Sequence, residues 1–318
     1  MAVAGDQLSE VFSLIEVQGV LTGGLAARGP WVSSAPITHP LKFVAMLSGR
    51  ARLRTDGLDA PIELAAGDVG ILNNCQWLEL RGGPMDVTPD ERQPDLPLAA
   101  MLGADPHHED AFLGGRIDLN PGGEALLRQA LPPVSHVRGA EPGAAGLRDT
   151  VNRLFSELAR QRIGSAFAVR QYGQLLLLEM LRAYLEQAEA LPSGWLQLLA
   201  DKRLSPAVTL MHTEPGRSWG LAELARACAM SRASFAERFR RVAGLPPLTY
   251  LSQWRMLQAQ RALSDGDTRI SALAAQLGYG SESAFSNAFK REVGISPASY
   301  RRRVRAADAE PAGSLAAP

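Results

Sequence analysis

The residues of this chain that could support acid–base, metal or thiol chemistry are few and scattered. Its 318 residues include five histidines and two cysteines. His107 and His108 are adjacent, so on a strand their side chains would point to opposite faces, and His39 stands alone before Pro40. A zinc-type site needs about three convergent ligands, and no such set can be assembled. We therefore expect no metal and no other cofactor.

The two cysteines, Cys75 and Cys228, fall in different predicted domains, so we expect neither a disulfide framework nor a cysteine-based zinc site. Cys75 ends a predicted strand, where a redox-responsive thiol could lie. A reactive thiol needs exposure and a lowered pKa, and the alternative is a small, buried hydrophobic residue. Cys228 lies on the inner face of a predicted helix and is expected in the core.

No motif for enzyme chemistry stands out. The glycine pairs at 23–24, 114–115 and 122–123 are turn signals, and no glycine-rich phosphate loop follows a strand. A nucleophile elbow is absent, and a Ser/His/Asp triad has no local signature. We expect that the chain is not an enzyme.

An internal repeat organises the C-terminal part of the chain. LAELARACAMSRASFAERFRRVAGLPPLTY (221–250) matches ISALAAQLGYGSESAFSNAFKREVGISPASY (270–300), at a spacing of 49 before an insertion near Gly280 and 50 after it. A repeat of this kind bears on the whole fold. The matched pairs are Phe235 with Phe285, Phe239 with Phe289, Gly244 with Gly294, Pro247 with Pro297 and Tyr250 with Tyr300.

Each copy predicts a helix, a short turn and a second helix. Apolar residues at 221, 224, 225 and 228 follow the spacing of one buried helical face. Ser231 and Ser281 occupy N-cap positions, and Gly244 and Gly294 fit helix ends. Any two-helix repeat could show this periodicity, but two copies with the same aromatic pair, glycine and proline favour a doubled helix-turn-helix, whose second helix can enter a major groove.

The second copy, GYGSESAFSNAFKREVGISPASYRR, resembles the C-terminal signature of AraC/XylS-type transcription regulators, and the resemblance covers roughly 204–303. It implies an all-α DNA-binding domain in which a long helix, here 247–263, joins the two helix-turn-helix units. Leu248, Leu251, Met256 and Leu263 are available for packing on that helix. One protomer could then read two successive major grooves, with centres roughly 34 Å apart.

The resemblance also implies which side chains meet DNA. The base-reading candidates are Arg232, Ala233, Ala236, Glu237, Glu282, Ser283, Ser286 and Asn287. Arginine can bond guanine, asparagine can bond adenine and glutamate can accept from cytosine. Ala233 and Ala236 depart from the family's better-known members and weaken hydrogen-bonded readout by the first helix. The phosphate-contact candidates are Arg238, Arg240, Arg241, Lys290, Arg291 and Arg301 to Arg303.

Charge is distributed unevenly, although the whole chain is neutral. Residues 1–194 carry 16 Lys and Arg against 23 Asp and Glu, a net of −7, and residues 195–318 carry 17 against 10, a net of +7. One basic end suits a duplex-binding domain. The N-terminus lacks a basic segment followed by an apolar run, and no apolar stretch approaches the ~18 residues of a membrane span. We expect a soluble, cytoplasmic protein.

Residues 1–140 are predicted to be mostly β. Short strands at 43–47, 50–55, 62–64 and 69–72 are separated by turn signals such as Ser48-Gly49 and Asp56-Gly57. The string LSGRARLRTDGLDAPIELAAGDVGIL resembles a small cupin-like β-barrel, which forms the effector-binding half of many regulators in this family. Metal-binding cupins share a His-x-His pair that the stretch around 42–43 lacks. The resemblance therefore implies an unknown small organic effector or an empty barrel.

Two amphipathic helices are predicted next, at 147–162 and 167–187. Leu175, Leu178, Leu181 and Leu185 form a wide apolar stripe, part of which packs on the barrel. The rest could pair two protomers as a homodimer, and a purely intramolecular role is the alternative. The predicted domains are therefore 1–140 (cupin-like), 141–192 (helical connector), 195–305 (DNA-binding) and 306–318 (a disordered tail by composition). The fold class is α+β multidomain.

These features predict a sequence-specific, effector-responsive DNA-binding transcription regulator, with activation through RNA polymerase as the expected mode. Two alternatives from other classes stay open. One is a metal-dependent cupin enzyme with a helical appendage, and the other is a helical adaptor whose basic domain docks an acidic partner.

Overall fold

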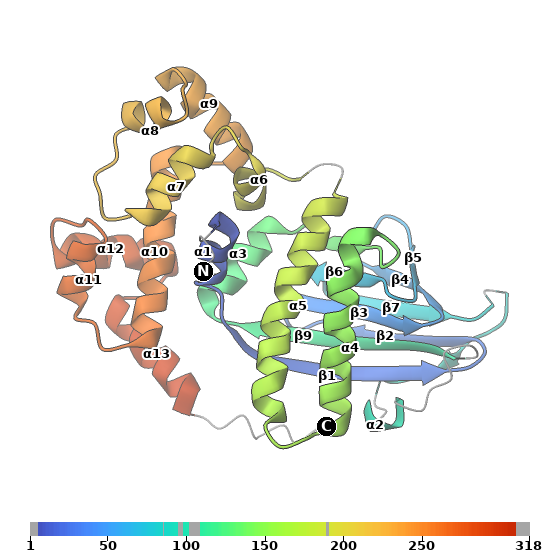
Figure 1. Cartoon of the computed structure of the whole chain (residues 1–318). Helices are drawn as coiled ribbons and strands as arrows, with labels where there is room; N and C mark the ends of the chain where they lie inside the picture. The colour runs from blue at the N-terminus through green and yellow to red at the C-terminus, as the bar shows by residue number, and fades with distance from the viewer. Residues whose placement is uncertain (1–5, 85, 95–97, 102–108, 189–190, 310–318) are drawn as a thin grey trace. The chain divides into compact units, whose positions relative to one another are not determined.

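The computed structural model describes residues 6–84, 86–94, 98–101, 109–188 and 191–309. It divides the chain into two compact units (Figure 1). One unit contains residues 15–192, and the other combines residues 1–14 with residues 193–318.

Two five-stranded sheets form the framework of the unit 15–192. The first sheet has the order β1 (Val17–Ala27), β9 (Asp110–Leu119), β3 (Leu41–Ser48), β6 (Val69–Asn73) and β10 (Val134–Val137). The second has the order β5 (Ile62–Ala65), β4 (Arg50–Thr55), β7 (Trp77–Gly82), β2 (Trp31–Pro36) and β8 (Asp90–Glu91). The expected barrel is therefore a cupin-like sandwich, in which the two sheets stay separate.

The strand alternation predicted for 50–55 is confirmed. Ala51 and Leu53 are buried between the sheets, whereas Arg50 and Arg54 are exposed. The segments at 43–47, 62–64 and 69–72 lie in β3, β5 and β6. The turn after β3 needs Gly49, whose φ is +68° and whose Cβ would lie 2.0 Å from a side-chain oxygen of Asp110. Residues from both sheets form one core: Leu25, Trp31, Val44, Met46, Leu53, Leu64, Leu72, Leu80 and Phe112.

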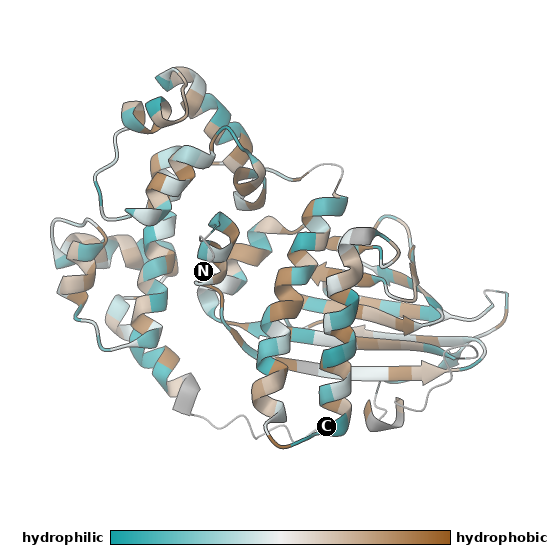
Figure 2. Cartoon of the chain, viewed as in Figure 1, coloured by the Kyte–Doolittle hydropathy of each residue, from teal (hydrophilic) through white to brown (hydrophobic). Residues whose placement is uncertain are grey.

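Helices complete this unit. They are α2 (Leu98–Met101), α3 (Pro121–Ala130), a 3₁₀ turn (Pro142–Ala144), α4 (Ala145–Arg160) and α5 (Ser165–Gln187). The α4–α5 pair confirms that two helices occupy the predicted segments. The separation of apolar and polar faces is clear in α4 and weak in α5, and Figure 2 shows apolar and polar residues interspersed along both. Helix α5 contacts β1 and β10, where Gly173 permits close approach because its Cβ would lie 2.5 Å from Val20.

The other unit is all-α. Its helices are α1 (Gln7–Phe12), α6 (Trp195–Ala200), α7 (Ser205–Thr213), α8 (Leu221–Ala227), α9 (Arg232–Ala243), α10 (Pro247–Asp265), α11 (Ile270–Gln276), α12 (Glu282–Val293) and α13 (Pro297–Ala309). Helix α13 continues through residues 306–309 of the predicted tail, and 310–318 lie outside the described residues. Across the ranges that the structure describes, no helix has both the length and the apolar character needed to cross a membrane.

Candidate functional sites

The repeat seen in the sequence is also a repeat in three-dimensional packing. The rings of Phe235 and Phe239 lie 5.7 Å apart, and those of Phe285 and Phe289 lie 5.8 Å apart. Each pair ends on a tyrosine of the following helix at 5.6 Å, edge to face. All four phenylalanines are fully buried. The α8–α9 and α11–α12 pairs therefore have the same core, which confirms the doubled helix-turn-helix.

Caps and turns in the two copies follow the sequence. The hydroxyl oxygens of Ser231 and Ser281 accept from backbone N–H groups at the start of α9 and α12, as N-caps do. Gly244 and Gly294 end these helices at φ +75° and +86°. Gly278 in the second turn has φ +78°, and its Cβ would lie 2.1 Å from the carbonyl oxygen of Gly216.

Helix α10 connects the two helix-turn-helix units by packing on both. Its first half contacts α7 and α9, and its second half joins a cluster with α11, α12 and α13. Leu251, Met256 and Leu263 are buried there as expected. The expectation for Leu248 is wrong, because it is 48% exposed. At about 100° per residue it falls outside the face that carries Leu251 and Trp254.

The predicted base-reading residues lie on the solvent side of both recognition helices. Arg232, Ala233 and Glu237 on α9 are exposed, and Ala236 is half-buried. On α12, Glu282, Ser283 and Asn287 are exposed, and Ser286 is half-buried. Each set therefore occupies the N-terminal, outward part of its helix.

The predicted phosphate contacts have different surroundings. Arg240, Arg241, Lys290 and Arg291 are exposed. Arg238 is half-buried, and its guanidinium pairs with Asp201 at 2.7 Å. Arg301 donates to the carbonyl oxygen of Thr268, Arg302 donates to Ser299 Oγ at 3.3 Å, and Arg303 lies 5.9 Å from the Tyr300 ring centroid. Arg238 and Arg301 are therefore already engaged within the domain.

A buried histidine joins α1 to the first helix-turn-helix. Nδ1 of His212 lies 2.9 Å from a Glu10 carboxylate oxygen, and Nε2 lies 2.7 Å from the Tyr250 hydroxyl. The His212 ring stacks on Trp254 at 3.7 Å. Burial lowers the pKa of His212 to about 3, so the neutral ring donates from Nδ1 and accepts at Nε2. No sequence signal marked this cluster, because Glu10 and His212 are 202 residues apart.

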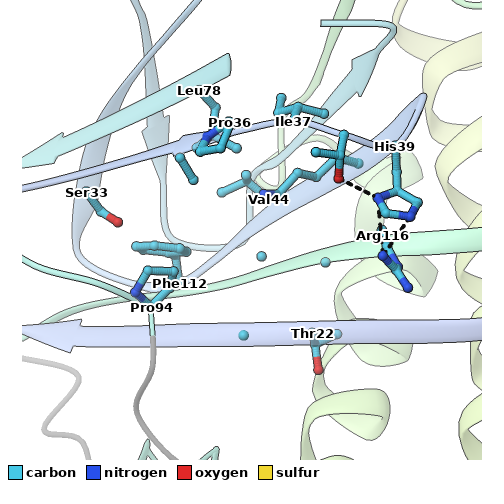
Figure 3. A pocket seen from close by; sticks show the side chains of 16 residues that line it. Thr22, Ser33, Pro36, Ile37, His39, Val44, Leu78, Pro94, Phe112 and Arg116 are labelled. Atoms are coloured by element: carbon cyan, nitrogen blue, oxygen red, sulfur yellow. Dashed lines mark hydrogen bonds between the residues drawn. The ribbon is translucent and has the colours of Figure 1, made fainter. Parts of the chain in front are cut away.

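The sandwich holds a pocket of about 290 Å³ between β1, β2, β3 and β9 (Figure 3). Ile37, Val44, Leu78 and Phe112 give it an apolar wall. Its polar side carries His39, Lys42 and Arg116.

The cations of this pocket differ in their partners. Arg116 Nη1 donates to His39 Nε2 at 2.6 Å, and Arg116 Nε lies 3.2 Å from an Asp118 carboxylate oxygen. Burial lowers the pKa of Lys42. His39, isolated in the sequence, is thus a neighbour of Arg116, which lies 77 residues away. The sequence interpretation missed Lys42 and Arg116, because their approach depends on strand pairing.

Both cysteines sit where a thiolate is disfavoured. Cys75 is 4% exposed, its sulfur lies 3.3 Å from the Pro133 carbonyl oxygen, and burial raises the pKa of its thiol. This surrounding favours the buried hydrophobic interpretation over the redox one. Cys228 is only half-buried and caps the end of α8, whereas a core position was expected. Burial raises the pKa of its thiol as well.

A metal site in this chain would have to be built from histidine, cysteine or acidic side chains. Within the described part of the chain, no group of three or more histidine, cysteine or acidic side chains is arranged to hold a metal ion. The adjacent pair His107 and His108 lies outside the described residues. A further histidine, His136, is occupied by Asp68 at 2.9 Å.

A cupin-like sandwich combined with a doubled helix-turn-helix defines a class of two-part regulators. The cupin family model matches residues 6–186, and the helix-turn-helix domain model matches residues 224–303. AraC-like transcription regulators of Streptomyces lividans and Streptomyces antibioticus are each 35% identical to this chain, covering 93% of it and 98% of their own lengths. The chain belongs to the AraC-like family, and it is a DNA-binding transcriptional regulator.

Further similarities cover different shares of the chain. The regulator MtrA of Neisseria gonorrhoeae is 30% identical over 300 residues, 93% of this chain and 95% of MtrA. The transcriptional activator RclR of Escherichia coli is 42% identical over 110 residues, 35% of this chain and 39% of RclR. The solved DNA-binding domain of AdpA in complex with a target DNA is 34% identical, covers 34% of this chain and 96% of that domain, and has a TM-score of 0.32.

Proposed function

We propose that this chain is a sequence-specific, effector-responsive regulator whose helices α9 and α12 enter two successive major grooves. One observation carries this proposal. The two helix-turn-helix units have the same aromatic core and the same capped recognition helix, and both present their N-terminal residues to solvent.

Helix α10 supports the two-groove arrangement. Its 19 residues, at about 1.5 Å each, span roughly 28 Å. That length is close to the roughly 34 Å between successive major-groove centres. Because α10 packs on α9 through Tyr250 and on α12 and α13 through Met256 and Leu263, it acts as a rigid spacer rather than a tether.

The side chains offer different chemistry to the two grooves. On α9, Arg232 suits guanine and Glu237 suits the amino group of cytosine, with Ala233 and Ala236 limited to apolar contact. On α12, Asn287 suits adenine, and Glu282, Ser283 and Ser286 add polar contacts. Phosphate attraction comes from the exposed cations Arg240, Arg241, Lys290, Arg291 and Arg302.

The proposal includes an effector, a partner and an oligomeric state. The pocket of the sandwich would bind a small organic effector and would not catalyse a reaction. Activation through RNA polymerase is the expected mode, and the similarity to an activator over 110 residues supports it. A homodimer would form through α5, where Phe167 and Leu175 are 63% and 47% exposed.

The test is a selection of bound genomic fragments by the full chain at two salt concentrations. We expect a motif with two blocks about one helical turn apart. An Arg232→Ala/Asn287→Ala variant should lose both blocks, whereas Asn152→Ala, on the exposed side of α4, should recover the same motif as the unaltered chain. Salt-sensitive binding without any motif would contradict the proposal and favour a basic domain that does not read sequence.

A further inference from the structure

Two cations lie directly opposite each other inside the sandwich. Lys42 of β3 is the register partner of Arg116 of β9. Such partners lie about 4.5–5.5 Å apart at Cβ and on the same face of the sheet, where like charges destabilise the pairing. This face also carries the buried Val44, Met46 and Phe112, so the pair lies at the edge of the inter-sheet core.

Within the described part of the chain, the charge of Arg116 is matched, but that of Lys42 is not. Arg116 has Asp118 at 3.2 Å and His39 at 2.6 Å. Among the described residues that line the pocket, none is acidic. Burial accordingly lowers the pKa of the Lys42 ammonium group. The described lining of the pocket therefore carries about one surplus positive charge at its polar end.

Lys42 is also unusual in the sequence. The chain has 33 basic residues, and Lys42, Lys202 and Lys290 are its only lysines. Lys42 is thus the single lysine of the unit 15–192, and it lies on the inward face of a strand. An ammonium at such a position is costly without a counter-charge.

The opposite wall of the pocket suits an apolar group. Ile37, Leu78 and Phe112 line it, and Figure 3 shows the Phe112 ring apart from the His39–Arg116 pair. Gly114 has no side chain, which leaves free space beside this wall. A Cβ at this position would meet only the Phe112 ring at 3.6 Å and a backbone oxygen at 3.9 Å. The volume, about 290 Å³, limits the occupant to a small molecule.

We propose that this pocket binds a small organic anion, namely a carboxylate on a compact apolar body. The carboxylate pairs with Lys42 and the Arg116 guanidinium, and the apolar body lies against Phe112, Leu78 and Ile37. This inference rests on the proposed effector role and names the chemical class of that effector. Charge-assisted hydrogen bonds at a partly buried site are the strong ones, so the carboxylate should decide specificity.

The first experiment is calorimetric titration of the full chain with 3-phenylpropionate, phenylacetate and hexanoate, each beside its primary amide. At least one carboxylate should bind on the order of ten- to a hundredfold more tightly than its amide. The same probe should protect Lys42 from reductive methylation, with Lys202 and Lys290 as controls in the same digest. Equal binding of acid and amide, or binding of neither by the folded chain, would overturn the proposal.

Two variants locate the site. Lys42→Met removes the charge at similar length and should abolish the preference for the acid without lowering the melting temperature, because it also removes the cross-strand repulsion. Gly114→Leu should exclude acid and amide alike. Arg54→Met, on the exposed face of β4, should behave as the unaltered chain. Acid preference that survives in a folded Lys42→Met variant would overturn the proposal.

DNA binding separates this inference from the proposed function. Selected DNA bound normally by a chain that binds no carboxylate would overturn the anion pocket alone. A carboxylate that binds through Lys42 to a chain without sequence preference would support the pocket and contradict sequence-specific regulation.

Discussion

Arg238 and Arg240 lie two residues apart on α9, but only one of them is free to meet a phosphate. Arg238 pairs with the largely buried Asp201 at 2.7 Å, whereas Arg240 is exposed. We expect Arg240→Ala to reduce the slope of log K against log salt by about one. Arg238→Ala should leave that slope nearly unchanged and lower the stability of the domain. Anisotropy titrations at several salt concentrations measure the slope, and an equal fall in both variants would contradict this assignment.

Asn287 carries the clearest prediction for base recognition. It is exposed in the second turn of α12, which begins after the Ser281 cap. Asn287→Ala should cost about 1–3 kcal/mol on the selected site and relax the preference at one base pair. Binding to a panel of single-base variants of the site measures both effects, with Asn152→Ala as the control. Unchanged affinity and preference would remove Asn287 from the reading surface.

At the residue scale, the sequence predicted what depends on local structure. Ser231, Ser281, Gly244 and Gly294 have positional meanings that hold without tertiary contacts, so the caps were predictable. Lys42 was not recognised, because its role depends on the opposition to Arg116 across a strand pair. A residue separation of 74 positions leaves no periodic signal in a single sequence.

The contact between α1 and α7 predicts a pH dependence of stability. His212 has a folded pKa of about 3 because of burial, whereas an exposed histidine titrates near 6.5. The unfolded state therefore binds more protons between these values, and acidification below about pH 6.5 destabilises the domain by up to about 1.4 kcal/mol per pH unit. The pKa of Glu10 is raised by burial and by Asp6; its contribution is lost as pH rises through that pKa, so it partly offsets the histidine term at the acidic end.

Urea unfolding of the full chain between about pH 5 and pH 7.5 tests this dependence. His212→Gln should be less stable than the unaltered chain near neutrality and should show a shallower decline toward pH 5. Glu10→Gln keeps an acceptor for Nδ1–H and should retain the decline. An equally steep decline in His212→Gln would mean that other groups cause the acid sensitivity.

Helix α5 leads to a prediction about assembly. Its N-terminal half presents Phe167 and Leu175 to solvent, and Ile163 just before it is fully exposed. These large exposed side chains on one element make α5 the candidate interaction surface of this unit. Leu175→Glu should shift the sedimentation of the chain from dimer to monomer, whereas Asn152→Glu on α4 should not. A monomeric unaltered chain would contradict the proposed homodimer.

At the element scale, the sequence predicted individual strands and helices, but it did not predict which elements pack on one another. The alternation of 50–55 and the paired helices 147–162 and 167–187 follow from periodicity alone. The packing of α1 on α7, with Gln7 Nε2 donating to the Ser205 carbonyl oxygen at 2.9 Å, joins segments 198 residues apart. A helix of six residues is too short for its sequence pattern to indicate which element it packs on.

At the scale of the whole molecule, the acidic and basic parts of the chain coincide with parts of different function. The acidic part, residues 1–194, contains the sandwich with its cationic pocket, and the basic part, residues 195–318, contains both recognition helices. The net charge of zero would have hidden this division. Electrostatic attraction to DNA is thus confined to the domain that reads it, and the local positive charge of the pocket must come from its own lining.

The rigidity of α10 determines how the chain responds to altered spacing between its two DNA blocks. Two helix-turn-helix units on a flexible connection would lose joint binding when five base pairs are inserted between the two DNA blocks. They would recover it when ten are inserted, because the two grooves then face the same side again. A single chain joined by a packed helix cannot lengthen, so both insertions should cost on the order of a hundredfold or more, the gain expected from joint engagement. Anisotropy titrations with the three duplexes measure this difference.

The Asn287→Ala variant shows which helix-turn-helix unit has lost contact with its DNA block on an inserted site. On the unaltered site it should weaken binding, but on either inserted site it should have little further effect, because α12 no longer meets its block. Arg232→Ala on α9 provides the opposite control and should weaken binding to all three duplexes, if α9 keeps its block. Recovery at ten base pairs would mean that α10 bends or that two protomers share the site, and the single-chain, two-groove model would fail.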